Sequence, residues 1–178
     1  MLGGAGNVGT MSARRRVIAG GAGSRYARIV SESASNYTAI YEIEFYTGAN
    51  QTGTIYPDAV GSMTSATAPS PLVAFSPQQY SAFYAAWKAF DNKDGSSGAT
   101  MWWNILTTYS QGWYIQLDTG QTSDPILSAK VTVNPGLSAS TDQTIFLRTS
   151  TTGAFSGEEI TRGSVVINST DSTPYNIG

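Results

Sequence analysis

The residues best suited to chemistry lie in an acidic turn at positions 91–95. Asp91 and Asp94 fall within this one short turn, which ends at Gly95. Calcium takes roughly 6–8 oxygen ligands and combines carboxylates with backbone carbonyls. Two carboxylates at a flexible corner therefore predict a structural calcium site with Asp91 and Asp94 as ligands. An ordinary turn, in which Asp91 accepts hydrogen bonds from nearby backbone amides, is the alternative interpretation.

Residues for catalysis are sparse. The chain contains no His and no Cys, which removes the commonest general base and any thiol nucleophile. Glu158 and Glu159 are adjacent, and Glu42 and Glu44 alternate along one expected strand. Nothing pairs these carboxylates across a cleft as glycoside hydrolysis requires, and no Ser-x-x-Lys motif is present. We therefore expect a protein that is not an enzyme.

The composition bounds the partners of this 178-residue chain. Charged residues are only 12% of the chain, and neutral polar residues replace them. Such a surface favours an extracellular or virion protein over a cytosolic enzyme. The formal net charge of -2 argues against broad nucleic-acid binding. No apolar run approaches the roughly 18 residues of a membrane span, so we expect none.

The hydrophobic pattern predicts an all-β protein. Alternating residues predict strands over 25–30, 40–46, 113–118, 126–133, 144–148 and 164–168. Turn residues separate these short strands, a pattern typical of an antiparallel sandwich. One helical stretch is expected over residues 77–89, where Tyr80, Phe83, Tyr84 and Trp87 recur at three- and four-residue spacing.

The first 23 residues form a separate segment that is rich in Gly. Its one basic cluster is Arg14, Arg15 and Arg16. The apolar residues that follow are too few for a signal peptide, which needs an apolar core of roughly 7–15 residues. A disordered tail is the simplest interpretation. We favour an extended anchoring arm over residues 1–24, in which the three arginines bind a partner subunit during assembly; phosphate contacts are a lesser alternative.

Three short motifs in the middle of the chain occur in the order known from one family. They are Ala89-Phe90-Asp91, Thr100-x-Trp102 and Trp113-x-Ile115-x-Leu117-Asp118-x-Gly120. Together they resemble the discoidin, or coagulation factor 5/8 type C, family of galactose-binding-like domains. The loop between Asp91 and Thr100 is several residues longer than is usual in that family.

Two further motifs resemble the same family but stand in a different order. Arg25-Tyr26-x-Arg28-Ile29 and Glu42-Ile43-Glu44-x-Tyr46 match the last two strands of the family and come first here. The chain is therefore similar to a circularly permuted form of the fold, an arrangement associated with virion proteins of tailed phages. Neighbouring termini allow such a permutation. The resemblance implies a jelly-roll sandwich over residues 25–178.

The resemblance also implies two binding sites. The calcium site of the family would draw on Asp91, Thr100 and Glu42 or Glu44, with Asp94 as a ligand from the longer loop. A glycan site would need an exposed aromatic ring beside hydrogen-bonding groups. Its candidates are Trp103, Tyr109, Asn104 and Trp87, with Tyr37, Asn36 and Gln111 also available. The family pattern buries Trp102 and Trp113, and alternation along a strand then turns Trp103 outward.

These observations lead to one expected function and one alternative. The first is a structural virion protein of a tailed phage, either a tail or head fibre or a capsid decoration subunit. It would contact other virion subunits through its arm, assemble as a homo-oligomer such as a trimer, and attach to host cell-surface glycan. The alternative is a secreted carbohydrate-binding module that belongs to a polysaccharide-active system. Contact between subunits is also an alternative role for any exposed aromatic residue.

Overall fold

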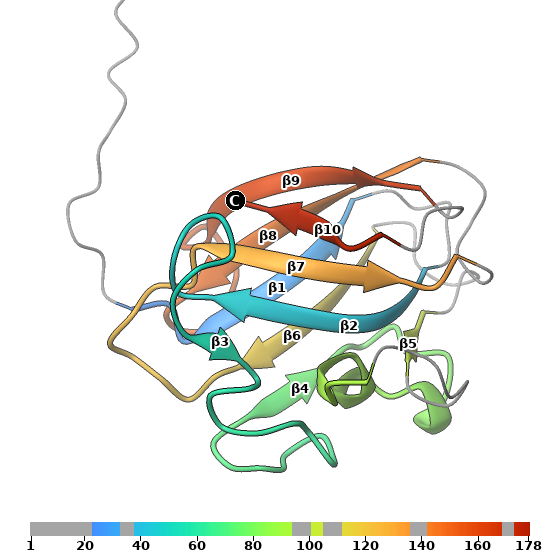
Figure 1. The fold of residues 1–178 in the computed structure, drawn as a ribbon, viewed down its shortest axis with the longest axis horizontal. Helices are drawn as coiled ribbons and strands as arrows, with labels where there is room; N and C mark the ends of the chain where they lie inside the picture. Colours follow the sequence, from blue (N-terminus) through green and yellow to red (C-terminus); the bar gives the residue numbers. More distant parts are fainter. Residues whose placement is uncertain (1–22, 33–37, 94–100, 105–111, 136–141, 169–172) are drawn as a thin grey trace, which may run out of the picture.

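The computed structural model describes residues 23–32, 38–93, 101–104, 112–135, 142–168 and 173–178, and these form a sandwich of two antiparallel sheets (Figure 1). Sheet A has the order β4-β6-β1-β8-β9, and sheet B has the order β10-β7-β2-β3, with β5 also paired to β2. The strands of sheet A are β1 (Tyr26–Ser31), β4 (Val73–Phe75), β6 (Trp113–Asp118), β8 (Gln143–Ser150) and β9 (Ile160–Ile167). Those of sheet B are β2 (Ala39–Tyr46), β3 (Ile55–Tyr56), β5 (Trp102–Trp103), β7 (Ser128–Val133) and β10 (Tyr175–Ile177). The expectation of an all-β sandwich is confirmed.

The core lies between the two sheets because alternate residues of each strand turn inward. In β6, Ile115 and Leu117 are fully buried, whereas Tyr114 and Gln116, which alternate with them, are half-buried on the outer face. Trp102 and Trp113 are both buried, and their rings pack 5.1 Å apart. Both tryptophans therefore belong to the core, as expected.

The first two strands of the chain are internal strands. β1 pairs with β6 on one side and β8 on the other, and β2 pairs with β7 opposite β3 and β5. In register, Arg28 of β1 lies opposite Gln116 of β6 and Arg148 of β8. β1 is thus paired along both edges with strands that come much later in the sequence.

The expected helix over residues 77–89 is replaced by two short 3₁₀ helices, η1 (Ala82–Tyr84) and η2 (Ala86–Phe90). Ser81 caps η1, since its hydroxyl accepts a hydrogen bond from the amide of Phe83. Ala85 then adopts an extended backbone (φ -66°, ψ 153°), which interrupts the helical path. Among the described residues, no helix is long and apolar enough to cross a membrane.

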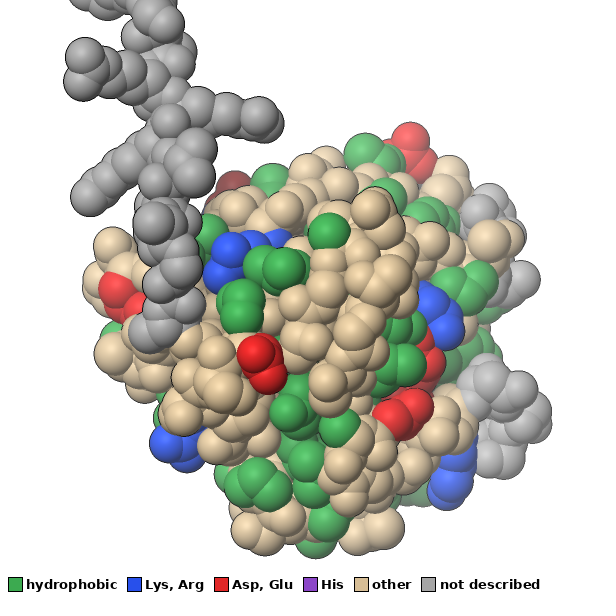
Figure 2. Space-filling view, turned by 60° about the vertical axis from the view of Figure 1, so that its left-hand side comes forward, with side chains coloured by type: hydrophobic (Ala, Val, Ile, Leu, Met, Phe, Trp, Pro, Cys, Tyr) green, Lys and Arg blue, Asp and Glu red, His purple; other side chains and the backbone are tan. Residues whose placement is uncertain are grey.

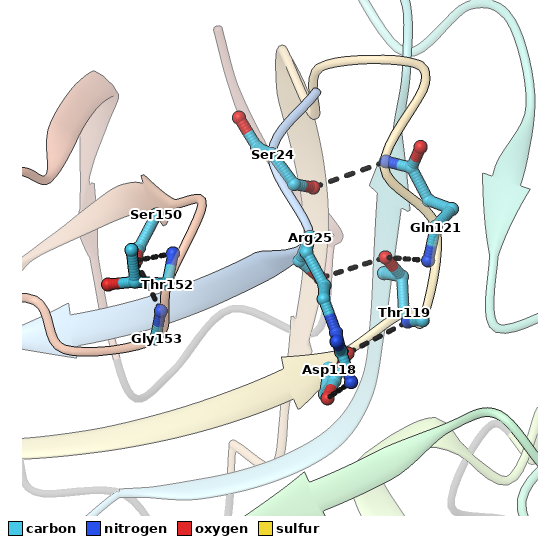
Figure 3. A network of polar contacts seen from close by, with 9 residues as sticks. Ser24, Arg25, Asp118, Thr119, Gln121, Ser150, Thr152 and Gly153 are labelled. Atoms are coloured by element: carbon cyan, nitrogen blue, oxygen red, sulfur yellow. Dashed lines mark hydrogen bonds and ion pairs between the residues drawn. The ribbon is translucent and has the colours of Figure 1, made fainter. Parts of the chain in front are cut away.

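Hydrogen bonds and an ion pair join Ser24 and Arg25 to residues 118–121 at and after the end of β6 (Figure 3). The Arg25 guanidinium donates two hydrogen bonds of 2.8 Å to the Asp118 carboxylate. The carbonyl of Arg25 accepts from the amide and the hydroxyl of Thr119, and the carbonyl of Ser24 accepts from the Gln121 side chain. Ser24 and Arg25, near the start of the described residues, are therefore joined to the segment that follows β6.

Candidate functional site

The acidic turn is held against the core by the residue that precedes it. Phe90, at the end of η2, is fully buried, and its carbonyl accepts a hydrogen bond from the amide of Met63. Asp91 follows at the C-terminal end of η2, and Asn92 turns the chain with a left-handed backbone (φ 55°). Asn adopts this conformation more readily than most residues. The turn thereby places Asp91 at the edge of the core rather than in solvent.

Glu42 of β2 is the second carboxylate at this turn. It is 9% exposed, and its Oε2 accepts a 3.1 Å hydrogen bond from the backbone amide of Lys93. Burial raises the pKa of Glu42 to about 9, and the nearby carboxylates of Asp91 and Glu44 act in the same direction. The backbone amides of Lys93 and Asn92 oppose this rise only in part. Glu42 and Asp91 therefore form a buried acidic pair.

Within the described structure, the Asp91 carboxylate has few partners for so buried a group. The residue is 4% exposed, and neither side-chain oxygen has a hydrogen-bond partner within the described structure. The Lys93 ammonium is 4.0 Å from Oδ2, and the Lys93 amide is directed to Glu42. Burial raises the pKa of Asp91, and the positive charges of Lys93 and Lys88 reduce that rise. A buried anion without partners is costly, and a divalent cation would compensate it.

The two carboxylates at this turn are hard oxygen ligands of the kind that calcium prefers, and they make up only part of the roughly 6–8 that it takes. Within the described part of the chain, no group of three or more acidic, His or Cys residues adds to the pair. The other two expected ligands, Asp94 and Thr100, lie outside the described residues. Glu44 is placed differently: its carboxylate is 2.7 Å from the Lys130 ammonium and accepts a hydrogen bond from the Tyr46 hydroxyl. Of the two glutamates on β2, Glu42 is the one at the turn.

The raised pKa of Glu42 predicts a pH dependence for the calcium-free protein. Between its ordinary pKa of 4.5 and about 9, folded Glu42 keeps a proton that the unfolded chain releases. The free energy of unfolding should therefore fall as pH rises through this window, by up to about 1.4 kcal/mol per pH unit. Urea unfolding at several pH values, in the presence of a chelator, measures the slope.

Glu42→Gln should flatten this slope, and an unchanged slope in that variant would contradict the prediction. Glu158 is the matched control. Its carboxylate accepts hydrogen bonds from the turn between β8 and β9, and the Ser150 hydroxyl is the main cause of its lowered pKa. Glu158→Gln should leave the slope within the window unchanged, because that carboxylate stays ionised throughout it, and should alter the pH dependence only below the window.

One of the expected glycan residues, Trp103 of β5, belongs to a cluster of four aromatic side chains. The aromatic cluster consists of Tyr80, Phe83, Tyr84 and Trp103. The Tyr80 and Trp103 rings stack at 4.6 Å with an interplanar angle of 20°, and Tyr84 meets Trp103 edge to face at 5.2 Å. Tyr80 and Phe83 are both 52% exposed, whereas Trp103 is half-buried. The outermost rings are therefore Tyr80 and Phe83.

The residues expected to bind sugar occupy varied positions in the structure. Trp103 does turn outward relative to Trp102, but Tyr80 stacks on it. Asn104 is only 4% exposed, and its side-chain oxygen accepts a 2.6 Å hydrogen bond from the Thr38 amide, so it holds the backbone. Trp87 is half-buried against the core. Tyr109 lies outside the described residues, as do Tyr37, Asn36, Gln111 and the arginines at 14–16.

Sequence reasoning missed Tyr80 and Phe83 as candidate sugar-binding residues, although it noted their spacing. The signal in the sequence was the recurrence of four aromatic residues, Tyr80, Phe83, Tyr84 and Trp87, within one short stretch. On the face drawn in Figure 2, charged side chains are few and lie among polar and hydrophobic ones. At the aromatic cluster, the Lys88 ammonium lies 4.3 Å from the centroid of the Phe83 ring.

In comparisons with known proteins, the chain matches no family model, no curated protein and no solved structure. The function of the chain must therefore be inferred from its own residues and from the motifs in its sequence.

Proposed function

We propose that this protein is a non-enzymatic adhesion module of a tailed-phage virion. Its fold would be a jelly roll of the galactose-binding type that uses the aromatic cluster to bind host glycan. The observation that carries this proposal is the exposure of the Tyr80 and Phe83 rings, each 52%. Aromatic rings of this kind offer apolar faces to the C–H surface of a sugar, and the Tyr80 hydroxyl offers a hydrogen bond.

The jelly roll and the virion role have separate support. Two antiparallel five-stranded sheets with β1 and β2 as internal strands are compatible with a permuted jelly roll. The virion role is supported by the resemblance of the motifs and by their order. Calcium would be held by Asp91 and Glu42, and its positive charge would fasten the turn to β2. The chain's own residues fix the geometry: Phe90 anchors the turn, and the Lys93 amide orients Glu42.

Loss of the exposed rings should weaken sugar binding. Tyr80→Ala and Phe83→Ala should each reduce affinity for a neutral glycan by about tenfold, because a sugar–aromatic contact contributes on the order of 1 kcal/mol or more. Binding is measured by calorimetry with galactose-, glucose- and N-acetylglucosamine-containing oligosaccharides. Val166→Ala is the control, since Val166 is 52% exposed on β9 and is not in the cluster. Equal losses in all three variants would contradict a site at the cluster.

Assembly through the arm tests the virion role. The full-length chain should form a defined oligomer, and deletion of residues 1–22 should yield a folded monomer. Light scattering gives the two masses, and circular dichroism checks that the sandwich persists, since the deletion leaves the contacts of Gly23 and Ser24 in place. An oligomer of unchanged mass would refute the anchoring arm. Two monomers that bind glycan would instead support the secreted carbohydrate-binding module.

A further inference from the structure

The outer faces of the two sheets differ in chemistry. On sheet B, the outward residues of β2 and β7 include Glu42, Glu44 and Lys130. On sheet A, the outward residues are mainly aromatic, aliphatic and Arg. The exposed or half-buried ones include Phe75, Tyr114, Val30, Phe146, Arg28 and Arg148. Aromatic residues and Arg are enriched where proteins bind partners, and Lys and Glu are depleted there.

Arg28 is held in one orientation at the centre of this outer face. Its guanidinium carbon lies 3.9 Å from the centroid of the Tyr114 ring and 3.8 Å from that of Phe155. Its Nε donates a 2.7 Å hydrogen bond to the Gln116 side chain. No acceptor for its two terminal nitrogens occurs among the described residues. The two rings and Gln116 thus fix a guanidinium whose terminal nitrogens are available.

No carboxylate of the described residues contacts the Arg28 guanidinium. Burial lowers the pKa of Arg28, and electrostatic attraction to Tyr114 and Glu159 opposes this. The Glu159 carboxylate is hydrogen-bonded to the Gly157 amide. Burying part of a cation without a counterion is costly, so an anion at the terminal nitrogens would offset a cost that the folded chain already bears.

A second guanidinium lies beside the first. Arg148 is opposite Arg28 in the pairing of β1 and β8, an arrangement that is unfavourable for like charges. Arg148 forms an ion pair with Glu32, whose side chain is 58% exposed, and the buried Nε of Arg148 lacks a hydrogen-bond partner within the described structure. Among the described residues, Arg148 has one contacting carboxylate, Glu32, and Arg28 has none; the exposure of Glu32 lets a ligand compete with it for Arg148.

We propose that Arg28 and Arg148 form a binding site for the carboxylate of an acidic sugar on the outer face of sheet A. A planar carboxylate matches the fork of guanidinium donors and can accept two parallel hydrogen bonds. The centroid of the Phe75 ring lies 6.2 Å from that of Tyr114, and Phe75 is 48% exposed. The Phe75 ring therefore offers an apolar surface for the sugar ring beside the charged group. Glu32 occupies Arg148 in the absence of ligand. This site is separate from the aromatic cluster and goes beyond the proposed binding of neutral glycan.

The test compares trigalacturonic acid with its methyl ester, which has the same sugar rings without the charge. Calorimetry with the full-length chain at low ionic strength should show binding of the acid at least about tenfold tighter than of the ester. Arg28→Lys and Arg148→Gln should each weaken binding of the acid about tenfold, because each loses charge-assisted hydrogen bonds. Glu32→Gln should strengthen it several-fold, since the internal competitor is removed.

The controls separate this site from the aromatic cluster and from loss of folding. Tyr80→Ala should leave acid binding unchanged, even where it weakens neutral sugars. Glu32→Gln changes an exposed side chain, so it remains informative if an arginine variant fails to fold. Equal affinity for acid and ester overturns the proposal, as does wild-type affinity in folded Arg148→Gln. Inorganic sulfate that binds more tightly than the galacturonate overturns the assignment to a sugar carboxylate.

Discussion

Calcium is expected to raise the midpoint of thermal unfolding of this protein by about 5–10 °C. The ion would bind the buried pair of Glu42 and Asp91. Burial raises the pKa of both residues, and the Asp91 oxygens have no hydrogen-bond partner within the described structure. A ligand present at roughly 100 times its Kd stabilises the folded state by about 2.7 kcal/mol. For a domain of this size, each kcal/mol shifts the midpoint by about 2–4 °C. Scanning calorimetry with calcium and with a chelator measures the shift.

Variants of Asp91, Glu42 and Glu44 test where calcium binds. Asp91→Asn and Glu42→Gln should abolish the calcium shift and should stabilise the chelated protein. Asp91→Asn removes a buried carboxylate with few partners, and Glu42→Gln removes a group that must take up a proton on folding. Glu44→Gln is the matched control on the same strand face, and it should retain the shift because Glu44 is paired with Lys130. A shift that survives in Asp91→Asn, or that is lost only in Glu44→Gln, would place the ion elsewhere.

Trp102→Ala is expected to cost about 3–5 kcal/mol of unfolding free energy, the range for truncating a large buried aromatic side chain. Trp102 is fully buried between the sheets, where it contacts the Trp113 ring. Its indole N–H has no hydrogen-bond partner within the described structure, so the ring is held by packing. Trp102→Phe should therefore be much milder than Trp102→Ala. Urea unfolding monitored by circular dichroism gives both values.

The adjacent tryptophan provides the comparison. Trp103→Ala should cost about 1–2 kcal/mol, because its half-buried ring loses mainly the stacking on Tyr80 and Tyr84. Equal costs at the two positions would contradict the inward and outward orientations. The same comparison checks the alternation on which the expectation for Trp103 was based.

The strands were predictable because their side chains alternate with a period of two. Ile115 and Leu117 in β6, and Ile145 and Leu147 in β8, mark the buried face without knowledge of the partners. The ends of the strands were less predictable, since pairing extends them: β9 begins at Ile160, four residues before the expected start at 164. Its early part pairs with β8 across a bulge, which breaks the alternation.

The choice between Glu42 and Glu44 could not be made from the sequence. The two residues are on the same face of β2, so alternation treats them alike. What distinguishes them is the position of the turn after η2, and that position follows from the burial of Phe90 and the left-handed Asn92. These are tertiary contacts between segments that are far apart in the chain.

The exposed aromatic rings also depended on local backbone conformation. A continuous helix would place Tyr80, Tyr84 and Trp87 on one face and bury them together. The extended Ala85 separates η1 from η2, so Trp87 turns to the core while Tyr80 and Phe83 stay at the surface. A single residue with extended φ and ψ values thus decides which rings can meet a ligand, and composition does not reveal it.

The internal position of β1 has a consequence for the kinetics of folding. Arg28 of β1 and its partner Gln116 are 88 residues apart in sequence, and the other neighbour, β8, is made later still. During synthesis, β1 must therefore wait for most of the chain before either of its edges is paired. Proteins dominated by such distant contacts fold slowly, because loop closure precedes the gain from pairing. We expect the apolar residues of β1 to be the segment most exposed to aggregation and to chaperones before the sandwich closes.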